Sequence, residues 1–491
     1  MTRNMNATVE VRSPKSEVRK KSEMPTPKPG VAAAFSARHR QRRQVPGGGT
    51  GATHERLRFS DFALRTSFGL RTSHFGLPLL AFATLGTPVT AAAAGATNLT
   101  FKADLSVKET YDSNVYLQDK DPDLTKVPQA VRPFQDSFVT SVTPRVGLDY
   151  VASPHFNVGV SYAPEVTYYH AEPSEDYVAH RGLLNFGGKA GPLPWQIANT
   201  FTYVQGSDEG LYFGGPGGAP AIGGIPIRDR RLQFVYRGKA SISWDVGHWF
   251  FRPVFAGYWH DFLTEQRSDP GYENYIDRRE LDMGGDVGWI LGSKSRVYAG
   301  YRFGYETEGH LLNSPYHYDA EFNRPLIGFE GQPWKWLKAN LAVGPDIHHT
   351  ISDYAPGFDP NYTTVWADVV VTLMPTDQDS FVLTWKENTQ PAFASTSVYD
   401  DITYDLLARH TFDKRWSVSA GFRIYAGEWY DPVSRDDWIY TASAGVAYKH
   451  DAHWSGELAY SYDWVQSKVP NTDGREFTRN LVWLGARYTF R

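Results

Sequence analysis

The sequence predicts an all-β fold, a transmembrane antiparallel up-and-down β-barrel of about 18 strands (16 to 18). Three observations carry this prediction. Apolar and polar residues alternate with a period of two from Leu99 onward, short and long connections alternate along the chain, and an aromatic residue usually opens the strand after a short connection. Membrane-spanning barrels combine these three features.

The chain divides into two regions of different composition. The first 96 of its 491 residues hold 15 of the 50 Lys and Arg but only 5 of the 54 Asp and Glu, and all Trp and Tyr follow Ala96. The remainder therefore carries a net charge of −14 rather than the −4 of the whole chain. This charge argues against binding to nucleic acid or another polyanion.

The first region predicts export. Residues 1–74 are basic and rich in Pro, Gly and Ser, so we expect a disordered extension, or a segment that precedes the true start of the chain. Residues 75–96 hold a short apolar stretch followed by small residues, which is the order of a secretory signal peptide. The barrel would then occupy residues 97–491, and the expected location is the bacterial outer membrane.

The alternation defines the strands. Leu99, Phe101 and Ala103 interleave with Thr100 and Lys102, which predicts a strand with one apolar and one polar face. The same reading predicts strands at 98–110, 138–150, 156–169, 178–190, 195–204, 230–245, 249–260, 278–290, 295–305, 319–331, 337–349, 363–374, 380–387, 398–410, 416–425, 437–449, 454–465 and 477–490. The strand at 319–331 is the least regular, because charged residues and a proline interrupt its alternation.

The connections predict which end of each strand faces which side. Those after even-numbered strands are short, such as 153–155 and 246–248, whereas those after odd-numbered strands are mostly long, such as 112–137 and 206–229. An outer-membrane barrel has short periplasmic turns and long outer loops. The Gly-rich loop 206–229 would be either a constriction or a lid, which the sequence leaves open.

Aromatic residues recur beside the short turns. They open seven strands: Phe156, Trp195, Trp249, Trp336, Phe381, Trp416 and Trp454. Aromatic rings collect where a membrane meets water, so this repeat favours a girdle over ordinary core packing.

The polar faces of the strands carry charge, which predicts a wet or ion-paired lumen rather than a dry core. By sequence, 19 cations and 13 acids lie on these faces, so we expect a mildly cationic wall. The candidate pore-lining residues are Arg145, Arg237, Arg252, Arg302, Asp149, Glu165, Asp282, Asp286 and Asp368.

Two segments resemble a known family. Glu109 to Leu117 (ETYDSNVYL) resembles the opening hairpin of the outer-membrane β-barrel porins of Gram-negative bacteria, a family of uncharacterised barrels. Leu481 to Phe490 (LVWLGARYTF) resembles the closing-strand signal read by the barrel assembly machinery, although Arg491 follows the usually terminal Phe. The resemblance implies an outer-membrane channel that contacts membrane lipids and that machinery, and it implies no particular solute.

The sequence contains only weak signals for a catalytic, cofactor or metal site. The chain has no Cys, so it has no thiolate metal site, disulfide or Cys nucleophile. We predict no catalytic site, no cofactor and no metal site, and we read the acidic run around Asp121 as a solvated loop.

The sequence therefore predicts a porin-like channel for passive diffusion of small hydrophilic solutes. The alternatives are a structural or surface-binding barrel with a plugged lumen, a polysaccharide-export channel and, less favoured, an outer-membrane barrel hydrolase. The oligomeric state is left open.

The signal-peptide reading gives a first prediction. Protein recovered from the outer membrane should begin near Gly95 or Thr97, because cleavage is expected after Ala94 or Ala96. Amino-terminal sequencing checks this, and recovery of residues that precede Phe75 would contradict it.

Overall fold

The computed structural model describes residues 98–117, 119–120, 134–205, 232–268, 274–292, 294–393, 397–431, 435–469, 472–473 and 476–490. All of them belong to one compact unit, Thr72–Arg491. The predicted extension 1–74, the signal peptide 75–96 and the loop 206–229 lie outside the described residues. Those three expectations stay predictions.

The described chain is almost entirely β-structure. Its strands are β1 (Asn98–Asp112), β2 (Ser137–Ser153), β3 (Phe156–Tyr169), β4 (Tyr177–Ala190), β5 (Leu193–Gln205), β6 (Leu232–Ile242), β7 (Trp244–Val246), β8 (Trp249–Phe262), β9 (Arg278–Gly292), β10 (Ser295–Glu308), β11 (Asp319–Trp334), β12 (Leu337–Thr350), β13 (Asn361–Leu373), β14 (Asp379–Pro391), β15 (Val398–Thr411), β16 (Trp416–Trp429), β17 (Asp436–Lys449), β18 (Trp454–Val469), β19 (Thr472–Asp473) and β20 (Phe477–Phe490). A single 3-10 turn, Pro173–Glu175, lies between β3 and β4.

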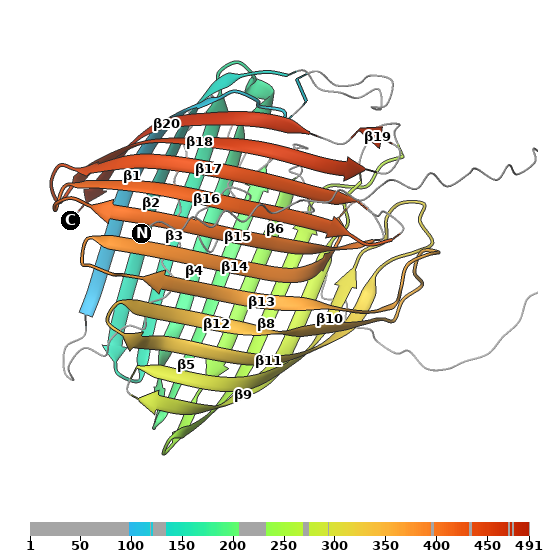
Figure 1. Ribbon diagram of the computed structural model, residues 1–491, viewed down its shortest axis with the longest axis horizontal. Coiled ribbons are helices and arrows are strands. Elements are labelled where there is room, and N and C mark those ends of the chain that lie inside the picture. The colour runs from blue at the N-terminus through green and yellow to red at the C-terminus, as the bar shows by residue number, and fades with distance from the viewer. Residues whose placement is uncertain are drawn as a thin grey trace, which may run out of the picture. The chain divides into compact units, whose positions relative to one another are not determined.

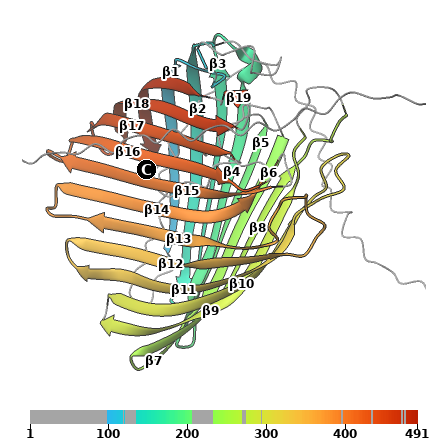
Figure 2. The ribbon, with the colours of Figure 1, turned by 45° about the vertical axis from the view of Figure 1, so that its right-hand side comes forward.

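The strands form one antiparallel sheet that closes on itself. Neighbours in the chain pair with each other, and β1 pairs with β20 in a ladder that runs from Ala103 opposite Phe490 to Asp112 opposite Leu481. The short strand β7 continues β6 along β8, and β19 adds a two-residue ladder to β18, so the wall has eighteen strands. Figures 1 and 2 show the resulting barrel, which confirms the predicted fold class.

Two strands differ from the prediction for identifiable reasons. The least regular predicted strand, 319–331, is the continuous strand β11, whose alternation is irregular because the apolar residues Phe322 and Leu326 lie on the inner face beside Arg324, while Glu321 lies on the outer face. The predicted strand 230–245 is broken at Ser243, where β6 ends and β7 begins.

The two faces of the wall have opposite chemistry. On β9, the side chains of Leu281 and Met283 are 68% and 56% exposed, whereas Arg278 and Asp286 on the other face are 3% and 2% exposed. Apolar side chains that point outward from a closed sheet are suited to lipid. Among the described residues, no helix is long and apolar enough to cross a membrane.

The short turns lie together at one end of the barrel, and local chemistry explains them. Gly191 and Gly247 have φ of 63° and 62°, the left-handed region that glycine adopts without strain. Asp413 and Asp451 each accept two backbone N–H groups at 2.7 Å, from the residues two and three positions further on. These donors lower the pKa of both carboxyl groups from its ordinary value, because they favour the ionised form.

The aromatic residues that follow the short turns lie on the outer surface. Six of the seven are exposed, and Trp195 is partly exposed beside Phe156, with ring centroids 6.4 Å apart. Trp249 packs edge-on against Trp289, and Trp454 packs against Tyr488, each at 4.9 Å. The rings thus form a band near one end of the barrel, as the girdle prediction requires.

The described chain begins and ends at the end of the barrel that carries the short turns. Asn98 pairs with Val151 just before the turn that joins β2 to β3, and Phe490 follows Tyr488, which pairs with Trp454 just after the turn that joins β17 to β18. In outer-membrane barrels this end faces the periplasm.

Cysteine labelling checks this sidedness, because the chain has no Cys of its own. Asp353→Cys, in the loop between β12 and β13, should react with a membrane-impermeant maleimide on intact cells. Lys414→Cys, in the turn between β15 and β16, should react only after the outer membrane is permeabilised. Both positions are exposed. If Lys414→Cys reacted on intact cells and Asp353→Cys did not, the barrel would have the opposite orientation in the membrane.

Candidate functional site

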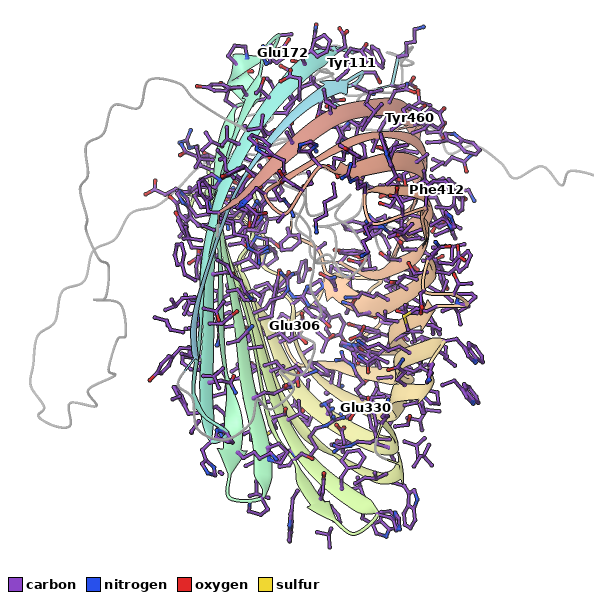
Figure 3. All side chains as sticks on the ribbon, turned by 90° about the vertical axis from the view of Figure 1, so that its left-hand side faces the viewer. Tyr111, Glu172, Glu306, Glu330, Phe412 and Tyr460 are labelled. Carbon is purple, nitrogen blue, oxygen red and sulfur yellow. The ribbon has the colours of Figure 1, made fainter. Side chains whose placement is uncertain are left out.

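The candidate site is the inner wall of the barrel, and Figure 3 shows Glu306 and Glu330 between its two sides. The strand register places all nine predicted pore-lining residues on the polar face of this wall. In the register Arg145 lies opposite Asp104, Arg252 opposite Asp286, and Asp368 opposite Lys386. Glu165 and Asp286 are buried, at 4% and 2% exposure. The structure thus places the nine residues where the alternation predicts them, while their role in a pore stays a prediction.

Three of the nine meet in one ion-pair network. Asp286 accepts a hydrogen bond from Arg252 Nε and forms an ion pair with Arg302 Nη2, both at 2.8 Å. Arg252 Nη1 also donates to both carboxylate oxygens of Glu330, at 2.8 and 2.9 Å. Arg296 extends the chain of charges to Asp245 at 3.0 Å. The network crosses the wall from β7 to β11, and pairing of this kind reduces the cost of holding charge beside a membrane.

Glycines make room for this network on the wall. A Cβ atom at Gly300 would lie 2.4 Å from Asp286 Oδ1, and one at Gly288 would lie 2.4 Å from a ring carbon of Phe250. Phe250 is fully buried, with the guanidinium carbons of Arg252 and Arg296 5.4 and 5.0 Å from its ring centroid. Glycine in a strand often marks such a close approach, and this was the signal in the sequence that could have located the network.

The other candidates do not join it. Glu165 pairs with Arg181 and accepts a hydrogen bond from Tyr177, and Asp149 pairs with the exposed Lys102. The guanidinium of Arg237 lies 4.7 Å from the ring centroid of Tyr258. Within the residues that the structure describes, no cluster of three His, Asp or Glu side chains has the arrangement of a metal site.

The structure adds charges to the inner wall that the alternation missed. They are Arg324, Asp112, Glu308, Glu330, Asp401 and Asp437. Because five of these six are acids, inward-facing cations and acids come nearly into balance among the described residues. The sequence count therefore overstated the cationic excess along the wall. Asp112 and Glu308 lie beyond the predicted ends of their strands, which is why they were counted with the loops.

At the outer end, side chains from distant strands meet. Arg278 of β9 pairs with Glu306 and donates a 2.8 Å hydrogen bond to Gln390 of β14, although four strands separate β9 from β14 in the sheet. Gln390 in turn donates to Asp401 of β15 at 2.8 Å. The backbone N–H of Ile276 bonds the carbonyl of Phe393 at 2.8 Å. This part of the lumen is therefore bridged.

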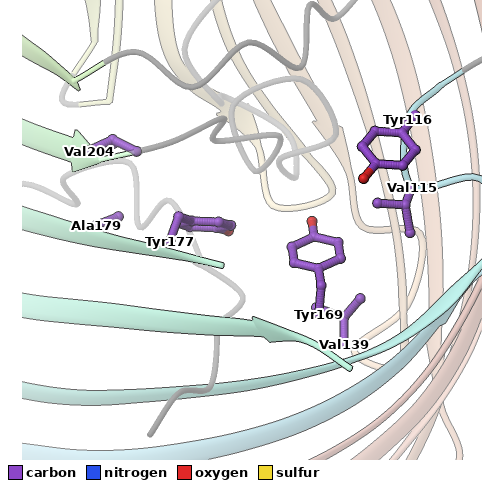
Figure 4. Close-up of a cluster of buried hydrophobic side chains, with 7 residues drawn as sticks. All are labelled: Val115, Tyr116, Val139, Tyr169, Tyr177, Ala179 and Val204. Carbon is purple, nitrogen blue, oxygen red and sulfur yellow. The ribbon is translucent and has the colours of Figure 1, made fainter. Parts of the chain in front are cut away.

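A second inward contact comes from residues 113–117, within the segment that carried the family resemblance. Arg479 donates two hydrogen bonds to the buried carboxylate of Asp112, and Asn114 Nδ2 donates to the carbonyl of Thr478. The chain then turns so that Val115 packs against one side of the wall and Leu117 against the other. Figure 4 shows Val115 and Tyr116 with the first set of partners.

The partners of Val115 and Leu117 come from strands on either side of β1. Val115 belongs to a buried cluster with Tyr116, Val139, Tyr169, Tyr177, Ala179 and Val204. Leu117 belongs to a cluster with Tyr425, Ile439, Val465 and Phe477. Residues 113–117 thus hold two parts of the outer rim together, and this role explains the conformation of the motif.

The closed sheet, the apolar outer surface and the paired charges inside define the class of this protein as an outer-membrane β-barrel. No family model matches the chain, and no curated protein matches its sequence. Its resemblances are among solved structures, and they are distant.

Three solved structures illustrate the resemblance. The outer membrane protein OpdK from Pseudomonas aeruginosa is 9% identical, with a TM-score of 0.38, over 80% of this chain and 99% of that one. OccK9 (OpdG) from the same organism is 11% identical, with a TM-score of 0.40, over 79% and 98%. OccAB3 from Acinetobacter baumannii is 10% identical, with a TM-score of 0.34, over 79% and 99%. Likeness this distant identifies no solute for the present chain.

The Asp286 network gives a stability prediction. Asp286→Ala leaves two arginines without their shared buried partner and should lower the free energy of unfolding by about 3 kcal/mol. Asp149→Ala removes an exposed pair with Lys102 and should lower it by less than about 1 kcal/mol. Denaturant titration in detergent micelles, followed by Trp fluorescence, measures both. Equal losses would show that the network does not brace the wall.

Proposed function

We propose that this protein is a porin-like channel through which small hydrophilic solutes diffuse across the outer membrane. The observation that carries the proposal is the closed eighteen-stranded wall with apolar side chains outside and charged side chains inside. A barrel of this size normally encloses an aqueous path. Arg252, Asp286, Arg302 and Glu330 on β8 to β11 are paired with one another, which lowers the cost of holding these charges on the wall.

The proposal includes no enzymatic activity and no cofactor. It also includes the expected interaction of Leu481 to Phe490, the greater part of β20, with the barrel assembly machinery. This segment supports that role because it forms the closing seam, with Leu481 opposite Asp112 and Phe490 opposite Ala103.

One observation favours a second candidate, a barrel with a plugged lumen. Arg278 and Gln390 bridge the outer end, and Leu117 and Val115 pack inward from the rim. These contacts narrow the outer mouth on two sides. They support either a constriction within an open channel or a structural barrel that passes nothing.

Single-channel recording in planar bilayers tests the proposal and separates the two candidates. The wild-type protein should produce discrete conductance steps. Leu117→Asn should raise the conductance, because it removes a buried apolar side chain, 3% exposed, that holds residues 113–117 inward. Asn can adopt the φ of 52° at this position. Leu312→Asn, at an exposed position in the loop between β10 and β11, should leave the conductance unchanged.

Two results would count against the channel, and a third would count against a constriction at Leu117. A silent wild-type protein with a conducting Leu117→Asn variant would establish the plugged barrel. A folded wild-type protein and variant that are both silent would reject passive diffusion. Equal changes in the Leu117 and Leu312 variants would show that the inward contact does not limit flow.

A further inference from the structure

A cavity of about 250 Å³ lies on the inner wall toward the end that carries the short turns. Strands β15, β16, β17, β18, β20 and β1 and the turn between β15 and β16 form its lining. Six cations line it, namely Lys108, Arg409, Lys414, Arg415, Lys449 and Arg487, with only two acids, Asp413 and Glu457. The lining therefore carries a net charge of about +4.

These cations differ from arginines on other strands of the inner wall. Among the described residues, Lys108, Arg409, Lys414, Arg415 and Lys449 have no carboxylate oxygen within 4.0 Å. Arg409 donates instead to the hydroxyl of Ser417 at 2.9 Å. By contrast, Arg252, Arg302 and Arg324 all have carboxylate partners within 3.0 Å. Five cations without a carboxylate partner thus gather at one place on the inner wall.

The two acids of the cavity do little to cancel this charge. One carboxylate oxygen of Asp413 accepts the backbone N–H groups of Arg415 and Trp416, which holds that carboxylate in its own turn. Glu457 accepts a hydrogen bond from Trp483 Nε1 at 3.3 Å and lies against Gly485, where a Cβ atom would be 3.1 Å from its Cγ. Neither carboxylate forms an ion pair with a lining cation within 4.0 Å among the described residues.

Small residues leave space between the cations. Ser106, Ser455 and Gly485 are inward-facing positions on adjacent strands β1, β18 and β20, and Ser417 and Ala447 continue this floor on β16 and β17. Long cationic side chains above a floor of small residues leave room for a ligand that several of them contact at once. Such an arrangement concentrates anions, because field lines converge where low-dielectric walls enclose a charge.

We propose that this cavity is a binding site for a small anion that carries two or more carboxylate or phosphate groups. The inference rests on the proposed function, since it names the class of solute that the channel handles. A singly charged anion would leave most of the excess charge uncompensated, whereas a folded macromolecule is far larger than the cavity. The site opens toward the end of the barrel that we assign to the periplasm, so access should be asymmetric.

Equilibrium binding tests the site without requiring conduction. Citrate and pyrophosphate should bind the detergent-purified barrel in calorimetric titrations, and acetate should bind at least about tenfold more weakly. Arg409→Gln with Lys449→Gln should weaken binding of the multivalent anions about tenfold at low salt. The effect should shrink in molar salt, where the Debye length falls to about 3 Å.

A matched variant removes the same charge from another part of the inner wall. Lys239→Gln with Lys338→Gln acts on exposed, inward-facing positions of β6 and β12 outside the cavity. It should change the affinity by less than about twofold, because these charges lie outside contact distance of the ligand. Equal loss in both double variants would overturn the proposal, as would acetate binding as tightly as citrate.

Recording in planar bilayers tests from which side of the membrane the anion reaches the site. Citrate should reduce the current at lower concentration when it is added at the side of the short turns, and the Arg409 and Lys449 variant should remove that asymmetry. Binding without any conductance would reject the channel and keep the site. Conductance without preference for multivalent anions would reject the site and keep the channel.

Discussion

The constraint on which the rest of this structure depends is that every backbone N–H and C=O group within the lipid needs a partner in the chain. A sheet satisfies this only when it has no free edge, so β1 must pair with β20. The seam joins residues near Asp112 to residues near Leu481, at opposite ends of the barrel sequence. Closure makes a lumen unavoidable, and the side chains that cannot face lipid must occupy it.

Charges on the inner wall are arranged differently on different strands. Along β7 to β11, Arg252, Arg296 and Arg302 are paired with Asp245, Asp286 and Glu330, and Gly300 leaves room for Asp286. On β15 and β17, Arg409 and Lys449 have no such partners among the described residues. Paired charges stiffen a wall and contribute little net potential, whereas unpaired ones attract counterions. The inner wall is thus nearly neutral in total but electrically uneven.

The outer rim is organised by packing as well as charge. Residues 113–117 turn inward because Asp112 is held by Arg479 and Asn114 by the backbone of Thr478, so Val115 and Leu117 face the lumen. Apolar clusters at this rim are compatible with water in the rest of the lumen, since they lie above the charged wall. The motif that suggested a family is therefore a structural anchor in this chain.

The strands and their faces were predictable from the sequence because both depend on a local period of two. Alternation such as Leu99, Phe101 and Ala103 specifies which side chains face lipid without reference to any other strand. It failed at Asp112, beyond the predicted end of its strand, and it blurred on β11, where the apolar Phe322 faces inward against His348 of the next strand. Both failures reflect contacts between strands.

By itself, the sequence determined the fold class, the strand order and the inner face that carries all nine candidate residues. Only the tertiary structure decided which inward-facing charges neutralise each other and which do not. Arg278 reaches Gln390 across the curve of the barrel, and Arg409 finds a serine rather than a carboxylate. Such side-chain contacts depend on the curvature of the wall and on the length of each side chain, which no local pattern encodes.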